Sequence, residues 1–182
     1  MSKPIISAGE FWSWAYSDFL SNAQRGVLAE YIVAKALGCT SRGRVEWDAY
    51  DIDAGPGLAV EVKSAAYLQS WSQRTLSPIR FDIANKRAWH AETSTYAPES
   101  ARSADVYVFC VFAAVERALA NPLDTAQWFF LVCRTALLNE RFRAQKTVAL
   151  SSLEALQLPR LGWEALGGHI RALVANTAAS VG

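Results

Sequence analysis

Apolar and polar positions alternate along residues 58–63, LAVEVK. Val60 and Val62 fall on one side of this stretch, and Glu61 and Lys63 fall on the other. A period of two residues is typical of a β-strand with one buried face. The pattern therefore predicts a strand whose polar face carries a carboxylate and an ammonium group roughly 7 Å apart.

The residues before this strand predict a β-hairpin. The sequence Gly55-Pro56-Gly57 is a turn signal, and an incoming strand precedes it. In that incoming strand Ile52 lies on one side, with Asp51 and Asp53 on the other. Across the turn, Asp51 can share the polar face of the return strand with Glu61.

Two helices are predicted before the hairpin, over residues 10–20 and 25–38. A serine precedes each helix, and a glutamate or glutamine lies three residues after that serine, which is the spacing of a capping box. Gly38 ends the second helix. The two serine pairs are Ser7 with Glu10 and Ser21 with Gln24.

The second helix carries a charge where the core should lie. At about 100° per residue, Glu30 falls within the apolar arc of this helix. A buried carboxylate is costly unless it is paired or binds a cation, so Glu30 is a candidate functional residue. The arc is formed by Val27, Tyr31, Ala34 and Leu37.

The remaining pattern predicts one α/β domain with a mixed sheet. We expect a single domain over residues 1–182, with a helical extension over 1–21 and a polar insert over 64–103. Apolar runs predict two buried strands, and a short strand and two helical segments follow them. These segments cover residues 104–115, 126–138, 147–158 and 162–177. Within 147–158, Ser151 and Glu154 have the spacing of a capping box.

Composition narrows the class of protein. The chain has 182 residues, of which 52% are apolar and 19% charged. Such a composition is typical of a compact globular protein. The chain has neither an apolar run of transmembrane length nor a signal-peptide pattern. Its isolated cysteines, Cys39, Cys110 and Cys133, favour a reduced cytoplasmic protein. The net charge of +1 means that any nucleic-acid surface must be local.

The sequence excludes several kinds of site. With only His90 and His169 and no CxxC pair, it lacks the ligands of a structural zinc site. It also lacks the GxSxG, P-loop and GxGxxG motifs. The remaining ionisable clusters consist of carboxylates and lysines, which favours a site for a hard divalent cation.

Four of these residues can converge: Glu30, Asp51, Glu61 and Lys63. Mg²⁺ prefers oxygen ligands, which Asp51 and Glu61 supply across the hairpin, and the Val62 carbonyl could add another. Lys63 could position or help deprotonate a nucleophilic water, and Glu30 could complete the metal shell. This set suits phosphodiester hydrolysis.

These residues resemble the PD-(D/E)xK nuclease superfamily. Tyr50-Asp51, nine residues and then Glu61-Val62-Lys63 are similar to its motif, with Tyr50 in place of the proline. The helix GVLAEYIVAKAL resembles the one that carries the superfamily's extra glutamate. The continuation EVKSAAYLQSW is similar to that of archaeal Holliday-junction resolvases, RecB-type nucleases and restriction enzymes, and Gln69 matches a glutamine found in some branches.

The resemblance implies a restriction endonuclease-like αβββαβ core, with a central mixed sheet flanked by helices. It also implies dependence on Mg²⁺, with Mn²⁺ as a substitute, and products with 5′-phosphate and 3′-hydroxyl ends. The metal ligands would be Asp51, Glu61, Val62 and Glu30. The catalytic residues would be Glu30, Asp51, Glu61, Lys63 and Gln69. Asp48 is the alternative to Asp51, which is preferred because Ile52 then points to the core.

The expected partner is nucleic acid, with DNA favoured over RNA and endonuclease over exonuclease activity. The predicted contacts are Ser64, Gln69, Trp71 and Arg74. Trp89 and the arginines between 74 and 102 could also stack on bases and hold phosphates. The chain could form a homodimer, and no membrane association is expected.

Two other readings stay open on the sequence alone. The chain could be a non-catalytic module that binds nucleic acid or protein on the same fold. It could also be a scaffold subunit that dimerises through the strands near 106–115 and 128–138. Strandedness, branching and sequence specificity of a substrate depend on surface shape, which the sequence does not define.

Overall fold

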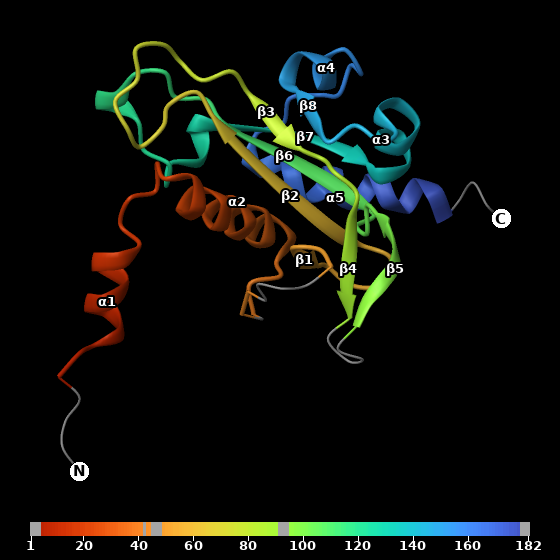
Figure 1. Ribbon diagram of the computed structural model, residues 1–182, viewed down its shortest axis with the longest axis horizontal. Helices are drawn as coiled ribbons and strands as arrows, with labels where there is room; N and C mark the ends of the chain where they lie inside the picture. The colour runs from red at the N-terminus through yellow and green to blue at the C-terminus, as the bar shows by residue number, and fades with distance from the viewer. Residues whose placement is uncertain (1–4, 42, 45–48, 91–94, 179–182) are drawn as a thin grey trace.

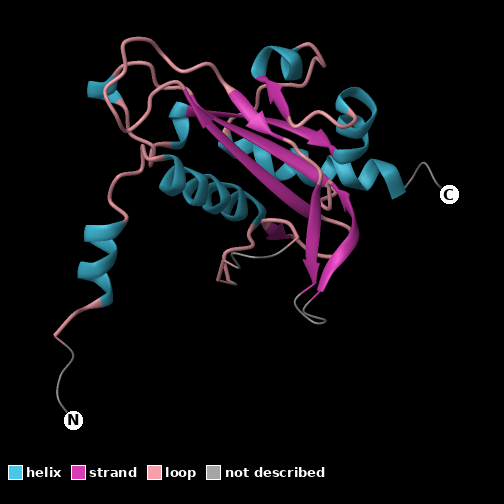
Figure 2. Cartoon of the chain, in the orientation of Figure 1, coloured by secondary structure: helices cyan, strands magenta, loops and turns pink. Residues whose placement is uncertain are grey.

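The chain folds into three layers around a central mixed sheet (Figures 1 and 2). The structure is a computed structural model that describes residues 5–41, 43–44, 49–90 and 95–178. Helices cover one face of the sheet, and short strands and helices cover the other. The predicted α/β class, with a central mixed sheet flanked by helices, is confirmed.

The central sheet has the strand order β1-β2-β6-β7. The antiparallel pair of β1 (Ile52–Asp53) and β2 (Ala59–Ala66) is the predicted hairpin. β2 runs parallel to β6 (Val106–Phe112), and β6 pairs antiparallel with β7 (Trp128–Arg134). β2 is thus paired with β6 from Val60 to Ala66 and with β1 only at Ala59 and Val60, and the long β6 ladder fixes the register of its side chains.

Two helices pack on the first face of this sheet. They are α2 (Asn22–Leu37), capped by Ser21 and ended by Gly38 as predicted, and α5 (Trp163–Ala178). Together with Val60 and Val62 they bury one apolar core. The α2–α5 contact is close, because a Cβ on Gly167 would overlap the carbonyl oxygen of Ala36 and lie 2.9 Å from its carbonyl carbon.

The second face carries a smaller layer. It contains β3 (Arg80–Asp82), paired antiparallel with β8 (Thr147–Ala149), and the helices α3 (Thr135–Phe142) and α4 (Leu150–Glu154). Their apolar side chains form a second core with residues of β6 and β7 that face this side. The central sheet is therefore covered on both faces over much of its length.

A separate two-stranded ribbon consists of β4 (Lys86–His90) and β5 (Thr95–Ala101). Arg102, directly after β5, is buried and anchors the ribbon to the second layer. Its guanidinium donates to the Ile83 carbonyl at 2.8 Å, to Asn139 Oδ1 at 2.7 Å and to the Gln145 carbonyl at 3.2 Å.

Three short helical elements complete the described chain. α1 (Ala8–Ala15) has the predicted Ser7–Glu10 capping box but contributes no buried residue, and it projects from the body (Figure 1). Two 3-10 turns, η1 (Arg117–Leu119) and η2 (Thr125–Gln127), lie between β6 and β7. Within the described ranges, no helix combines the length and the apolar character needed to cross a membrane.

The predicted apolar face of α2 is wrong. Val27 and Tyr31 are 43% and 52% exposed, and the buried apolar side chains are instead Ala29, Ile32, Val33 and Leu37. The helix is rich in apolar residues around its circumference, so a three- to four-residue spacing starting at Val27 selects the wrong stripe. Glu30 consequently lies at the edge of the buried face rather than inside it.

Two predictions near the C-terminal half also need correction. The strand predicted over 126–138 ends at Arg134, and α3 follows directly, where the Thr135 amide donates to the Asp105 carbonyl at 3.0 Å. The apolar run continues across that boundary and hides it. Ser151 does not cap α4, because β8 leads straight into the helix at Leu150 and Ala149 occupies the cap position.

The close α2–α5 contact predicts opposite effects for two adjacent glycines. Gly167→Ala should lower the free energy of unfolding by about 1–3 kcal/mol, because the new methyl group meets the backbone of α2. Gly168→Ala is the matched control, since nothing lies within 4 Å of its Cβ position. This control should raise stability by about 0.5–1 kcal/mol. Urea denaturation measures both, and equal effects would contradict the close contact.

Candidate active site

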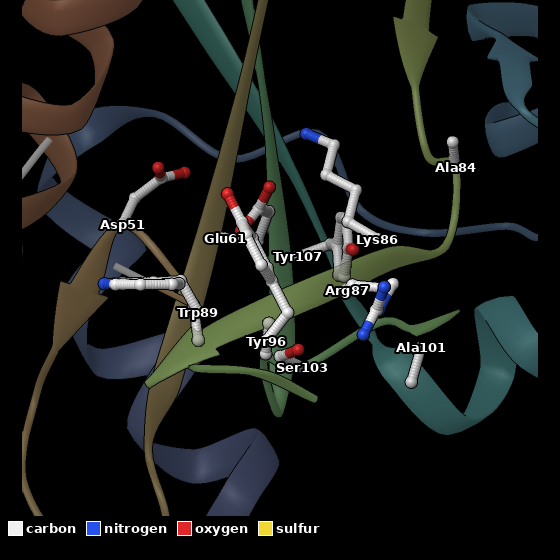
Figure 3. A pocket seen from close by; sticks show the side chains of 12 residues that line it. Asp51, Glu61, Ala84, Lys86, Arg87, Trp89, Tyr96, Ala101, Ser103 and Tyr107 are labelled. Atoms are coloured by element: carbon white, nitrogen blue, oxygen red, sulfur yellow. The ribbon is translucent and has the colours of Figure 1, made fainter. Parts of the chain in front are cut away.

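A cavity of about 610 Å³ opens between the β1–β2 hairpin, β6 and the β4–β5 ribbon (Figure 3). Asp51, Glu61 and Tyr107 line the side formed by the central sheet. The ribbon lines the other side with Lys86, Arg87, Trp89 and Tyr96. Two carboxylates therefore face basic and aromatic side chains across one space.

Strand register brings the two carboxylates together. Ile52 pairs with Val60, so Asp51 stands opposite Glu61 on the second face of the sheet. The Asp51 amide donates to the Val60 carbonyl at 3.1 Å, and Asp51 Oδ2 accepts from the Val62 amide at 2.7 Å. The predicted sharing of a face by Asp51 and Glu61 is confirmed.

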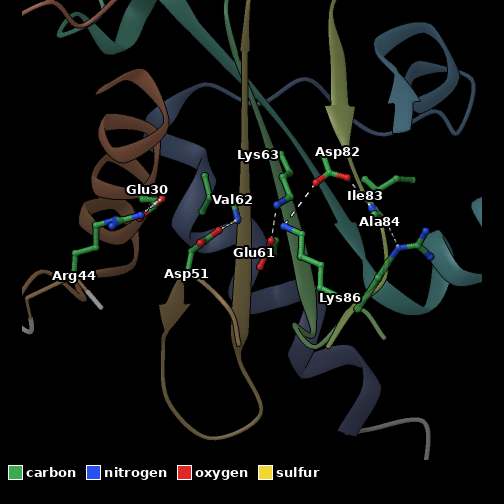
Figure 4. A network of polar contacts seen from close by, with 11 residues as sticks. Glu30, Arg44, Asp51, Glu61, Val62, Lys63, Asp82, Ile83, Ala84 and Lys86 are labelled. Carbon is green, nitrogen blue, oxygen red and sulfur yellow. Dashed lines mark hydrogen bonds and ion pairs between the residues drawn. The ribbon is translucent and has the colours of Figure 1, made fainter. Parts of the chain in front are cut away.

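Lys63 joins the site through Glu61 (Figure 4). Its Nζ lies 2.5 Å from Glu61 Oε1, and the two side chains are only 16% and 13% exposed. Burial lowers the pKa of Lys63, but the charge and hydrogen bond of Glu61, with the charges of Asp51 and Asp82, raise it by more. Lys63 is therefore held as an ammonium group beside the carboxylates.

Of Glu30, Asp51 and Glu61, only Asp51 has no Lys or Arg side chain paired with it among the described residues. Burial raises its pKa most, and the charges of Glu61 and Glu30 raise it further, while the Val62 amide and Lys63 lower it. The resulting pKa is about 6, against an ordinary 3.8. Such a shift at a cleft is typical of functional carboxylates that hold a cation or a proton.

Glu30 approaches the site from α2 but is already paired. Arg44 donates to both its carboxylate oxygens, with Nε–Oε2 at 2.5 Å and Nη2–Oε1 at 3.1 Å. Figure 4 shows this pair on the far side of Asp51 from Glu61. Over the residues that the structure describes, no three Asp, Glu, His or Cys side chains gather into a ready-made metal group.

Sequence comparison adds an independent finding. The family model of bacteriophage T4 endonuclease IV matches residues 13–152, well over half of the chain. The chain belongs to the bacteriophage T4 endonuclease IV family. Membership in this family indicates a nuclease, with nucleic acid as its substrate. Neither the curated proteins nor the solved structures contain a match.

The region matched to the endonuclease IV family contains all the predicted site residues, but the structure separates some of them. The Ser64 hydroxyl and Gln69 are buried away from the cavity, and the Gln69 amide donates to the Ala66 carbonyl at 3.0 Å. Trp71 and Arg74 lie exposed in the loop between β2 and β3. Their predicted roles stay predictions, as does that of the Val62 carbonyl; Asp48 lies outside the described residues.

The sequence pattern missed several residues of the cavity, among them Tyr96, Tyr107 and Lys86. Tyr107 lies opposite Glu61 in the parallel β2–β6 register, and Lys86 is the first residue of β4. A tyrosine inside the otherwise apolar strand VYVFCVF is the only local signal for Tyr107. Nothing local marks Lys86, because the ribbon is brought to the site by long-range contacts.

The raised pKa of Asp51 predicts that this residue costs stability. Its pKa in the folded chain, about 6, exceeds the ordinary 3.8, so ionisation disfavours folding above pH 6 and the cost vanishes below about pH 4. Asp51→Asn should therefore raise the free energy of unfolding by roughly 1–3 kcal/mol at pH 8 without divalent cations. Thermal unfolding across this pH range measures the difference.

Asp53→Asn is the matched control for this experiment. It removes the same charge from an exposed position of the same hairpin. Its stability should change by no more than about 0.5 kcal/mol, as is usual for a surface substitution. If Asp51→Asn raises the free energy of unfolding equally at pH 4 and pH 8, the charge of Asp51 is not the cause.

Proposed function

We propose that this chain is a Mg²⁺-dependent endonuclease that hydrolyses phosphodiester bonds in DNA. The observation that carries the proposal is the pairing of Asp51 and Glu61 across the hairpin, with Lys63 held against Glu61. Family membership supports the nuclease part of the proposal. Cleavage to 5′-phosphate and 3′-hydroxyl ends, and DNA rather than RNA as substrate, follow from the superfamily resemblance.

The donor set at the cavity fits a hard divalent cation. Asp51 and Glu61 offer oxygen ligands, which Mg²⁺ and Mn²⁺ prefer, and Mg²⁺ is commonly bound by one or two carboxylates with water and substrate phosphate. Among the described residues, no Lys or Arg forms an ion pair with Asp51, so its charge is available to a cation. Glu30 and the Val62 carbonyl are the further ligands proposed from the resemblance.

A bound cation would supply charge that stabilises the phosphoryl oxygens and lowers the pKa of water. The chain's own groups would orient the reactants. Lys63, charged beside Glu61, can donate hydrogen bonds to the attacking water and to a non-bridging phosphate oxygen. The Val62 amide holds Asp51 by one oxygen, at 2.7 Å, which restricts how that carboxylate can turn.

The superfamily assignment is part of the proposal. In favour of it, α2, β1 and β2 follow one another as a helix and a hairpin, and Glu30, Asp51, Glu61 and Lys63 belong to this part of the chain. The connection from β2 to β6 differs from an αβββαβ core, because it contains β3, β4 and β5 and no helix among its described residues. The ribbon is then an addition to that core.

Two further expectations belong to this proposal. The whole chain would act as one nuclease domain carrying the N-terminal α1 as an extension. Homodimer formation is tested by the mass of the chain in solution, for example by light scattering. The exposed apolar side chains of α1, among them Trp12 and Trp14, give such a dimer a surface to use.

Cleavage that depends on both metal and Lys63 tests the proposed function. We expect the wild-type chain to cut labelled DNA with Mg²⁺ or Mn²⁺ and not with EDTA. Lys63→Ala and Asp51→Ala should lower the rate at least about 100-fold, because each removes charge that stabilises the reaction. Single-stranded, duplex and branched DNA should be compared, with gel analysis of the products.

Asp53→Asn serves as the control in the cleavage assay, because it removes a neighbouring acid that does not line the cavity, and it should keep near wild-type activity. Full activity in Lys63→Ala or Asp51→Ala would contradict the proposed mechanism. Cleavage of RNA but not of DNA would keep the site and correct the substrate.

Binding of the cation can be measured without any substrate. At pH 8 a hundredfold excess of Mn²⁺ over its Kd should stabilise the wild-type chain by about 2.7 kcal/mol, which raises Tm by roughly 5–10 °C. Asp51→Asn should lose most of this gain, since it removes one of the three proposed carboxylate ligands and the one that no Lys or Arg side chain pairs with among the described residues. An equal Tm gain in both proteins would place the Mn²⁺ elsewhere.

A further inference from the structure

The β4–β5 ribbon forms the wall of the cavity that faces the two carboxylates. Lys86, Arg87 and Trp89 of β4 and Tyr96 of β5 all line it (Figure 3). None of these residues belongs to either apolar core. Their place at the cavity therefore calls for an explanation other than core packing.

The aromatic pair of the ribbon has ring surface to offer. Trp89 and Tyr96 pack edge to face, with centroids 4.9 Å apart and planes at 63°. In such an arrangement each ring keeps at least one face that its partner does not cover. Trp89 is half-buried and lines the same cavity as Asp51, whereas Tyr96 is 57% exposed, with the Arg87 guanidinium 5.7 Å from its ring centroid.

The basic groups of the ribbon are held weakly. Lys86 lies 3.7 Å from Asp82 in an ion pair whose side chains are 61% and 53% exposed. Exposed pairs of this kind contribute little to stability. Arg87 is exposed and donates through Nε to the Ala97 carbonyl at 2.7 Å. Both cations can therefore turn toward a phosphate without breaking a buried interaction.

We propose that the ribbon is a nucleotide-binding arm, in which Trp89 stacks on a nucleobase next to the phosphate held at Asp51 and Glu61. Lys86 and Arg87 would contact the adjoining backbone phosphates. This inference rests on the proposed nuclease function and names the parts of the substrate that the ribbon contacts, a nucleobase and the adjoining phosphates. The base must be unstacked from its neighbours for the indole to cover it.

The size and the chemistry of the cavity agree with this occupant. Its volume is about 610 Å³. That volume lies in the usual range for small-molecule sites and accommodates one nucleotide. Acidic groups that suit a cation lie on one wall, and basic and aromatic groups that suit phosphate and base lie on the other. Trp71, which the sequence also offered as a stacking residue, is 56% exposed and does not line the cavity.

Binding to two DNA probes separates base stacking from phosphate contact. The probes are a labelled single-stranded oligonucleotide of mixed sequence and a strand of equal length made only of abasic sites. Binding is measured by fluorescence anisotropy with Mg²⁺, using the full chain with Lys63→Ala in every arm to suppress cleavage. Gel analysis confirms that the probe stays intact.

Trp89→Leu keeps apolar bulk against Tyr96 but removes the ring. It should weaken binding to the mixed sequence by roughly 5- to 150-fold and leave binding to the abasic strand within about twofold. Trp89→Phe should retain most of the affinity. Trp71→Leu tests the other stacking residue that the sequence offered, and it should leave binding to both probes unchanged because Trp71 does not line the cavity.

Lys86→Gln gives the complementary signature. It should weaken binding to both probes by the same factor and reduce the salt dependence of binding by about one phosphate contact. Thermal unfolding of each variant shows whether the fold is kept, and Trp89→Phe covers the case in which the leucine variant does not fold.

The base-stacking role is overturned if Trp89→Leu weakens both probes equally, or neither, or if Trp71→Leu produces the selective loss instead. These outcomes leave the nuclease function standing when wild-type cleavage needs metal and Lys63. Absence of metal-dependent cleavage overturns the nuclease function itself, whatever the two probes show.

Discussion

The site depends on one constraint, which is the alternation of side chains along β2. The strand pairs with β6 from Val60 to Ala66 and with β1 at Ala59 and Val60, so its register cannot slip without breaking the long β6 ladder and the short hairpin ladder. Val60 and Val62 fill the core beneath α2 and α5, and this burial forces Glu61 and Lys63 onto the opposite face. Hydrophobic burial on one side of a strand thus holds two charges, at a defined spacing, on the other.

Placing charged side chains on this half-buried face lowers the free energy of unfolding unless each charge has a partner. Lys63 neutralises Glu61, and Arg44 neutralises Glu30, whereas Asp51 receives one backbone hydrogen bond and has a pKa of about 6. Selection for stability alone would not retain a carboxylate with this raised pKa. The proposed cation site would give this carboxylate at the cavity wall a role that offsets its cost, because a bound cation would compensate the charge of Asp51.

Local sequence signals predicted the parts of the fold that local interactions determine. The hairpin, the caps at Ser7 and Ser21 and the strand at 58–63 depend on neighbours in sequence, and all are present. The buried stripe of α2 was predicted wrongly, because a helix with apolar residues around its circumference does not reveal which side meets the sheet. The Glu30–Arg44 pair and the ribbon wall arise from contacts distant in sequence, which no short motif encodes.

The limits of the family match, residues 13–152, do not coincide with the limits of the folded unit. α5 lies beyond the match, yet Leu166 and Ile170 are fully buried in the core that holds β2. The Trp163 indole also donates to the Ile32 carbonyl at 3.1 Å, which ties α5 to the middle of α2. α1 lies at the other limit and has no buried residue. Since α2 supports the strand that carries the candidate site, the folded unit that holds this site extends through α5, while α1 contributes no buried residue to it.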